Sequence, residues 1–85
     1  MTEFYYFSTA WCGPCKAFKP VVQQAVSELG MPMQFVDAEQ NADLAAKYSI
    51  RSVPTIVVVQ AGQPIYRNTG TMSKQQLMSV LGQFK

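Results

Sequence analysis

A continuous aromatic segment near the start of the chain constrains the fold more than any other feature. Residues 3–7 read Glu-Phe-Tyr-Tyr-Phe, a strand candidate whose apolar side chains are continuous rather than alternating. Neighbouring side chains of a strand point to opposite faces of the sheet, so such a strand is expected to be buried on both faces. Helices must then cover both faces, which predicts an α/β fold.

A long amphipathic helix is predicted directly after this strand, opening near Cys12. Its apolar stripe at helical spacing consists of Phe18, Val21, Val22, Ala25, Val26 and Leu29. Pro14 falls in the first turn, where a missing N–H costs nothing, and Gly30 is a stop signal. Pro20 lies deeper in the helix, where a kink is expected.

The remaining elements follow from turn and capping signals. Asn41 is expected to cap a short helix, and Ser73 with Gln76 has the form of a capping box. The predicted elements are a strand at 33–37, a helix at 41–48, a strand at 55–59, a hairpin turn at 60–62, a return strand at 64–68 and a last helix burying Leu77, Val80, Leu81 and Phe84. The order βαβαββα predicts one domain over residues 1–85, with a parallel first β–α–β unit and an antiparallel closing hairpin in a four-stranded mixed sheet.

Charge and hydropathy exclude several function classes. The net charge is +2 and the basic residues are scattered, whereas a nucleic-acid footprint needs clustered lysine and arginine. The first residues lack the features of a signal peptide, and the apolar run at 56–59 is too short to span a bilayer. We therefore expect a monomeric, cytoplasmic protein that binds neither nucleic acid nor membranes. In that reducing compartment a lone cysteine pair is more often catalytic or metal-binding than structural.

The two cysteines, Cys12 and Cys15, stand at the opening of the predicted helix. Unpaired N–H groups and the helix dipole stabilise a thiolate there, so the pKa of Cys12 is expected to lie below that of a free thiol. Lys16 adds a little favourable charge. Cys12 is the predicted nucleophile toward a substrate disulfide, and Cys15, one helical turn along, is placed to resolve the mixed disulfide.

Two other uses of the pair stay open. A structural disulfide closing so short a loop would add only about 2 kcal/mol of stability. A zinc site needs four ligands, whereas the chain has two cysteines and no histidine, so no metal is expected unless a dimer pools its thiolates.

Several segments resemble the thioredoxin family, in order and over nearly the whole chain. Residues 11–16, Trp-Cys-Gly-Pro-Cys-Lys, have the form of its active-site motif, and Pro20 matches the proline in its active-site helix. Residues 47–55 resemble the segment that ends in its cis-proline. Gly62 and residues 69–74 resemble its hairpin glycine and the loop before its last helix. The resemblance implies a minimal thioredoxin fold.

The resemblance also implies the surroundings of the cysteines. The Val53-Pro54 bond is expected to be cis and to lie against the pair, and the Val53 backbone is expected to pair with an extended substrate segment. The predicted docking surface is formed by Trp11, Gly13, Pro14, Val53, Pro54 and Gly70. Phe7 and Phe18 are assigned to the core.

The implied activity is reduction of protein disulfides without a bound cofactor, the redox-active group being the Cys12–Cys15 disulfide itself. The Gly-Pro loop resembles that of reducing thioredoxins. The implied partners are a thioredoxin-reductase-type flavoprotein and disulfide-containing substrates such as ribonucleotide reductase. A glutaredoxin-like use of glutathione and a binding subunit with dispensable thiols are the alternatives.

The sequence departs from the family pattern in two respects. It starts at the strand that leads to the cysteines, without the family's first strand and helix, so one sheet edge is expected to be less covered. Tyr6 stands where the family usually has a buried aspartate, and Phe35 aligns with its usual lysine partner. We therefore expect Tyr6 to support a resolving step that depends less on an internal base.

Overall fold

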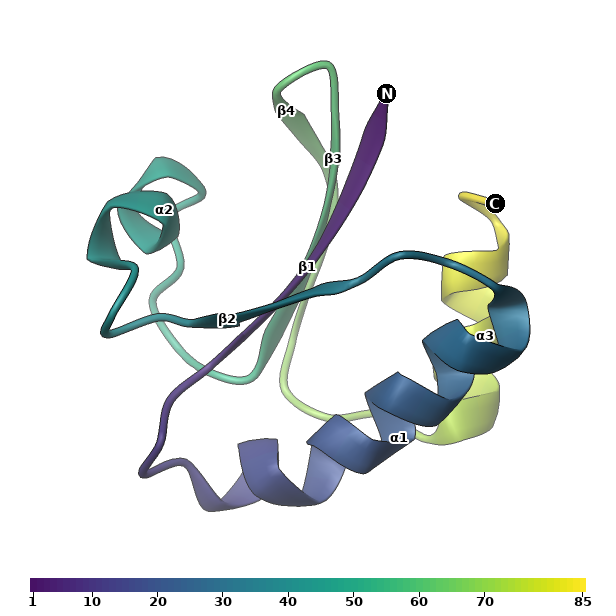
Figure 1. Ribbon diagram of the computed structural model, residues 1–85, viewed down its shortest axis with the longest axis horizontal. Helices are drawn as coiled ribbons and strands as arrows, with labels where there is room; N and C mark the ends of the chain where they lie inside the picture. The colour runs from purple at the N-terminus through teal and green to yellow at the C-terminus, as the bar shows by residue number, and fades with distance from the viewer.

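The computed structural model describes residues 1–85 and contains four strands and three helices in the predicted order (Figure 1). The elements are β1 (Thr2–Ser8), α1 (Gly13–Leu29), β2 (Gln34–Asp37), α2 (Ala42–Lys47), β3 (Thr55–Gln60), β4 (Gln63–Thr69) and α3 (Lys74–Gly82). None of the helices is both long and apolar enough to cross a membrane.

The strands form one mixed sheet in the order β2-β1-β3-β4. β1 runs parallel to β2, and both β1–β3 and β3–β4 are antiparallel, as predicted for the first β–α–β unit and the closing hairpin. Phe7 of β1 pairs with Val36 on one side and with Thr55 on the other. In this strand order β2 is one of the two edge strands of the sheet. Phe35 on β2 is 38% exposed.

The continuous apolar run of β1 divides between two cores, as its lack of alternation predicts. One core lies between the sheet and helices α1 and α3, and it receives Phe4 and Tyr6 from β1. The other lies on the opposite face beneath α2, and it receives Tyr5 and Phe7. Figure 1 shows α1 and α3 together on one side of the strands and α2 on the other. This is the predicted α/β arrangement with helices on both faces.

Three of the predicted helix ends have the expected geometry. Cys12 is the N-cap of α1 and Gly30 ends that helix with φ +67°, in the left-handed region. Ser73 and Gln76 form a complete capping box at the start of α3.

The packing of α3 differs in part from the prediction. Leu77 and Leu81 are buried, whereas Val80 is only partly buried, and Phe84 follows the helix and lies against Tyr66 with ring centroids 5.7 Å apart.

The prediction that Asn41 caps α2 with its side chain is wrong. Asn41 precedes the helix, but its side chain makes no capping hydrogen bond. Its Nδ2 instead donates to the carbonyl of Asp37 at 3.0 Å. The Asp37 carboxylate accepts from the N–H groups of Glu39 and Gln40, so a turn centred on Asp37 leads the chain into the helix.

Candidate active site

The two cysteines lie where the chain leaves β1 and enters α1. They form a disulfide with their Cα atoms 5.2 Å apart, and Cys12 is 5% and Cys15 2% exposed. The chain is extended at Cys12, with φ −85° and ψ 108°, and helical from Gly13 onward. A buried strand followed by the helix start therefore places both sulfurs near the rim of the sheet, one turn of helix apart.

The helix start provides a hydrogen-bond donor to the sulfur of Cys12. The backbone N–H of Cys15 points at Cys12 Sγ with the two atoms 3.1 Å apart, so Cys12 caps α1 with its side chain. When the disulfide is reduced, this N–H and the positive end of the helix dipole face the thiolate that Cys12 would carry. The geometry suits Cys12 as the attacking sulfur.

A second segment approaches the cysteines from the far end of β3. The Val53-Pro54 peptide bond is cis, as the resemblance implied, and the Val53 carbonyl oxygen lies 3.9 Å from Cys12 Sγ. The N–H of Gly70 donates to the Pro54 carbonyl at 2.9 Å. Val53 therefore lies against the disulfide, and Gly70 is joined by a hydrogen bond to the adjoining Pro54.

The residues predicted to form the docking surface differ in exposure. Trp11 is 69% exposed, and Gly13 and Pro14 are exposed beside it. Val53 and Gly70 are half-buried. Pro54, predicted to lie on the surface, is buried because it directly precedes the buried strand β3. Of the six residues predicted to form the docking surface, five are therefore accessible at least in part, and Pro54 is not.

Tyr6 lies under the active-site helix and is completely buried. Its hydroxyl donates a hydrogen bond to the backbone carbonyl of Cys15 at 2.9 Å. Burial raises the pKa of Tyr6 to about 12. The hydroxyl is therefore neutral at physiological pH and cannot act as a base there. Lys16, the other predicted supporting residue, is exposed at the surface.

Thr9 is a site residue that the sequence analysis did not identify. It is 8% exposed, and its Oγ1 has no hydrogen-bond partner. It lines a hollow of about 310 Å³ together with Cys15, Lys16, Lys19 and Asp37. The only sequence signal was its position directly after β1, at the end of a buried strand where functional side chains often lie.

A second hollow lies beside the exposed Trp11 and is mainly apolar. It encloses about 390 Å³ and is lined by Thr9, Trp11, Ala38, Ile50, Arg51, Ser52 and Val53. No three side chains of His, Cys, Asp or Glu come together as a metal-ion site requires. The groups that converge here are thus a disulfide, a helix start, a free backbone edge and an apolar hollow, which suit exchange with another disulfide.

Comparisons with known proteins agree with this chemistry. Residues 3–83 match the family model described as Thioredoxin. A thioredoxin-like protein of Synechocystis is 36% identical over 86 residues, covering 99% of this chain and 79% of the relative. A thioredoxin of Staphylococcus aureus is 35% identical over 77 residues, covering 88% of this chain and 74% of the relative.

Solved structures give the same result. The X-ray structure of Fasciola hepatica thioredoxin superposes with a TM-score of 0.88 at 30% identity, covering 99% of this chain and 81% of that one. The match extends over the fold of nearly the whole chain. In this chain the disulfide-bonded Cys12 and Cys15 stand at the start of α1. The chain therefore belongs to the thioredoxin family and is a thiol–disulfide oxidoreductase of the protein-disulfide reductase type.

Proposed function

We propose that this protein works as a cytoplasmic reductant that receives electrons from a thioredoxin-reductase-type flavoprotein and passes them to disulfide-containing proteins, ribonucleotide reductase among them. The observation that best supports the proposal is the position of Cys12. Its sulfur accepts the N–H of Cys15 at the helix start and faces the carbonyl of Val53. In the reduced protein this arrangement would bring the attacking thiolate of Cys12 beside the backbone at Val53.

The proposed cycle starts from the reduced pair. The Cys12 thiolate attacks one sulfur of the substrate disulfide, a new S–S bond forms, and the other substrate sulfur leaves as a thiolate that takes up a proton. Cys15 then loses its proton and attacks Cys12, which releases the second substrate thiol and forms the Cys12–Cys15 disulfide. The substrate gains two electrons from the pair and two protons, one that Cys15 releases and one that solvent supplies, and no bound cofactor takes part.

Docking is proposed to use the exposed residues around the disulfide. An extended substrate segment would pair with the backbone at Val53, as a strand added at the end of β3. Trp11, Gly13, Pro14 and Gly70 would contact its side chains. The glycine at 13 has open space around it, since an added Cβ would meet nothing within 4 Å, so a partner's backbone can come close at that point.

The first test is reduction of insulin disulfides with NADPH and a thioredoxin reductase. Turnover that disappears in Cys12→Ser supports the proposal, and Cys15→Ser should accumulate the mixed disulfide because the resolving sulfur is gone. A parallel reaction uses glutathione and glutathione reductase. Turnover only in that reaction would contradict the proposed donor and favour a glutaredoxin-like role.

A binding role with dispensable thiols makes a different prediction. The double variant Cys12→Ser/Cys15→Ser would keep its biological activity if the protein were only a binding subunit. A reductant loses its activity in the same variant. Thermal unfolding of the double variant, followed by circular dichroism, shows whether any loss comes from the chemistry or from the fold.

A further inference from the structure

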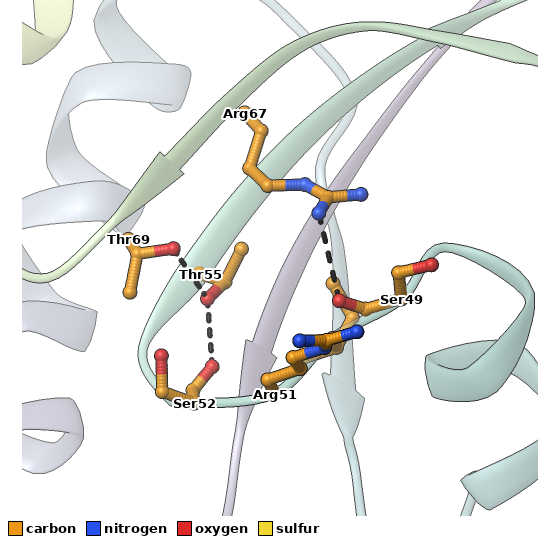
Figure 2. Close-up of a pocket in the computed structure, with 7 residues that line it drawn as sticks. Ser49, Arg51, Ser52, Thr55, Arg67 and Thr69 are labelled. Carbon is orange, nitrogen blue, oxygen red and sulfur yellow. Dashed lines mark hydrogen bonds between the residues drawn. The ribbon is translucent and has the colours of Figure 1, made fainter.

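A pocket rich in arginine and hydroxyl groups lies next to the proposed docking surface. It encloses about 310 Å³ and is lined by Ser49, Ile50, Arg51, Ser52, Thr55, Arg67 and Thr69. We call it the arginine pocket. Figure 2 shows the guanidinium groups of Arg51 and Arg67 on the Ser49 side of the pocket, with Ser52, Thr55 and Thr69 opposite them.

The positive charge of this pocket is not neutralised. No carboxylate lines it, and the one ion pair of the structure, Lys74 with Glu28, involves neither arginine. Arg51 is exposed and makes no hydrogen bond within the chain. Two guanidinium groups around one pocket repel each other, and an anion between them would remove that repulsion.

Arg67 is held in place while keeping donors for a ligand. Its Nη1 lies 3.5 Å from the carbonyl oxygen of Ser49, and its Nη2 donates to the carbonyl of Tyr48, where α2 ends. A guanidinium has five N–H donors, so these two contacts leave others available. A planar group fixed in this way suits recognition of a carboxylate or phosphate by paired hydrogen bonds.

Hydroxyl groups complete the donor set on the opposite side of the pocket. Thr55 Oγ1 lies 2.7 Å from the carbonyl oxygen of Ser52 and 3.5 Å from Thr69 Oγ1. Thr55 gives its single hydrogen to that carbonyl, so a hydrogen bond between Thr55 and Thr69 uses the hydrogen of Thr69, and the Ser52 hydroxyl remains able to donate to a ligand. The pocket thus offers charged and neutral donors and only one apolar side chain, that of Ile50.

The arginine pocket adjoins the hollow beside the active site. Ile50, Arg51 and Ser52 line both the pocket and the hollow that contains Trp11 and Val53. The Val53 carbonyl is in turn 3.9 Å from Cys12 Sγ. Arg51 precedes Val53 by two positions in the chain. Because an extended chain advances about 3.3 Å per residue, the substrate side chains to test against Arg51 are those a few residues from the attacked cysteine.

We propose that the arginine pocket binds the carboxylate of an acidic side chain on the substrate protein, near the disulfide that is to be reduced. The inference rests on the proposed function and adds a preference to it. A substrate with a glutamate or aspartate at the correct distance from its disulfide docks through Arg51 and Arg67, in addition to the apolar contacts at Trp11. Substrates with a neutral residue at that position dock without this contact.

The test uses disulfide-containing peptides in matched pairs. Each pair carries glutamate or glutamine at one position, two to four residues before or after the attacked cysteine. At low ionic strength the glutamate member of at least one pair should be reduced with a kcat/KM about fivefold higher, the upper range for a partly exposed ion pair. The difference should be in KM, because the contact forms on docking, and it should shrink in salt.

Two variants and one control locate the effect. Arg51→Gln should bring the glutamate-to-glutamine ratio close to one, and Arg67→Gln should do the same. Because Arg67 also contacts the end of α2, Arg51→Gln decides the matter if Arg67→Gln folds poorly. Lys85→Gln removes the same charge outside the pocket and should leave the ratio unchanged. A ratio that persists in both arginine variants would overturn the assignment to this pocket.

The remaining outcomes separate this inference from the proposed function. Equal, Cys12-dependent reduction of every pair overturns the carboxylate preference and leaves the reductase intact. Failure to reduce any peptide overturns the proposed function as well. Inorganic phosphate is added as a third arm. If it shifts the NMR signals of Arg51 and Arg67 while no peptide pair differs, the pocket is a small-anion site and the proposal is wrong.

Discussion

The substitution Tyr6→Phe should remove one part of the protein's loss of stability at alkaline pH. Tyr6 is fully buried, and burial raises its pKa from 10.0 to about 12. The unfolded chain therefore loses this proton near pH 10, whereas the folded protein keeps it until about pH 12. The stabilising contribution is fully present below pH 10 and is lost as the pH rises through 12. At about 1.4 kcal/mol per pH unit, the loss amounts to between about 2 and 3 kcal/mol.

At neutral pH the same substitution should have a smaller effect. It removes the hydrogen bond from the Tyr6 hydroxyl to the Cys15 carbonyl but leaves the aromatic ring in place. A hydrogen bond of this kind contributes about 1 kcal/mol, which corresponds to a fall in Tm of about 4–8 °C in a domain of this size. The variant is thus less stable than wild type at pH 7, and the difference should narrow and then reverse as the pH approaches 12.

Urea unfolding of the oxidised proteins between pH 7 and pH 11.5 measures this difference. The oxidised form is used because disulfide-bonded cysteines do not titrate. Tyr5, whose pKa is also raised to about 12, by burial and by its hydrogen bond to Glu3, is present in both proteins, so its contribution cancels. Parallel stability curves for Tyr6→Phe and wild type above pH 10 would refute the reasoning, because Tyr6 would then ionise equally easily in both states.

Three further substitutions test the ends of the helices, each by urea unfolding at pH 7. Ser73→Ala should cost about 1 kcal/mol, because it removes the side chain that accepts the N–H of Gln76 at 3.1 Å; an unchanged midpoint would show that the capping box adds nothing. Asn41→Ala should cost less than about 0.5 kcal/mol, since its side chain makes no capping bond and its hydrogen bond to the Asp37 carbonyl is exposed to solvent; a loss as large as that of Ser73→Ala would contradict this. Gly30→Ala should cost about 1 kcal/mol, because Gly30 has φ +67°, a left-handed conformation that disfavours a side chain. An added Cβ would meet no atom within 4 Å, so a clash adds nothing to this cost. A gain in stability would refute the prediction.

Features set by neighbouring residues could be predicted from the sequence. The capping box of Ser73 and Gln76 and the left-handed Gly30 each depend on a few adjacent positions. The burial of β1 on both faces follows from its uninterrupted apolar side chains. The position of the cysteines at the start of α1 depends only on the junction between a buried strand and an amphipathic stripe. In all these cases local physical preferences agree with the final fold.

Features that depend on which segments meet in space could not be predicted. Asn41 was an acceptable cap by residue type, but the turn formed by Asp37 takes its side chain. The arginine pocket brings Arg67 from β4 to the loop around Arg51. That meeting depends on the register of β4 against β3, which includes an irregularity between Val58 and Val59. Composition and spacing do not determine such a register.

Tyr6 stands where the family usually has a buried carboxylate, and this difference changes which group can accept the proton of Cys15. The Tyr6 hydroxyl already donates to the Cys15 carbonyl, and its pKa of about 12 makes the tyrosinate rare at neutral pH. It therefore holds the active-site helix without acting as a base. Cys15 itself lines the hollow shared with Thr9 and Asp37, and the unpaired Thr9 hydroxyl faces no protein partner. The proton acceptors that the structure leaves are solvent and the Asp37 carboxylate, which lines the same hollow as Cys15, so the resolving step should depend on pH through the thiol of Cys15 and not through Tyr6.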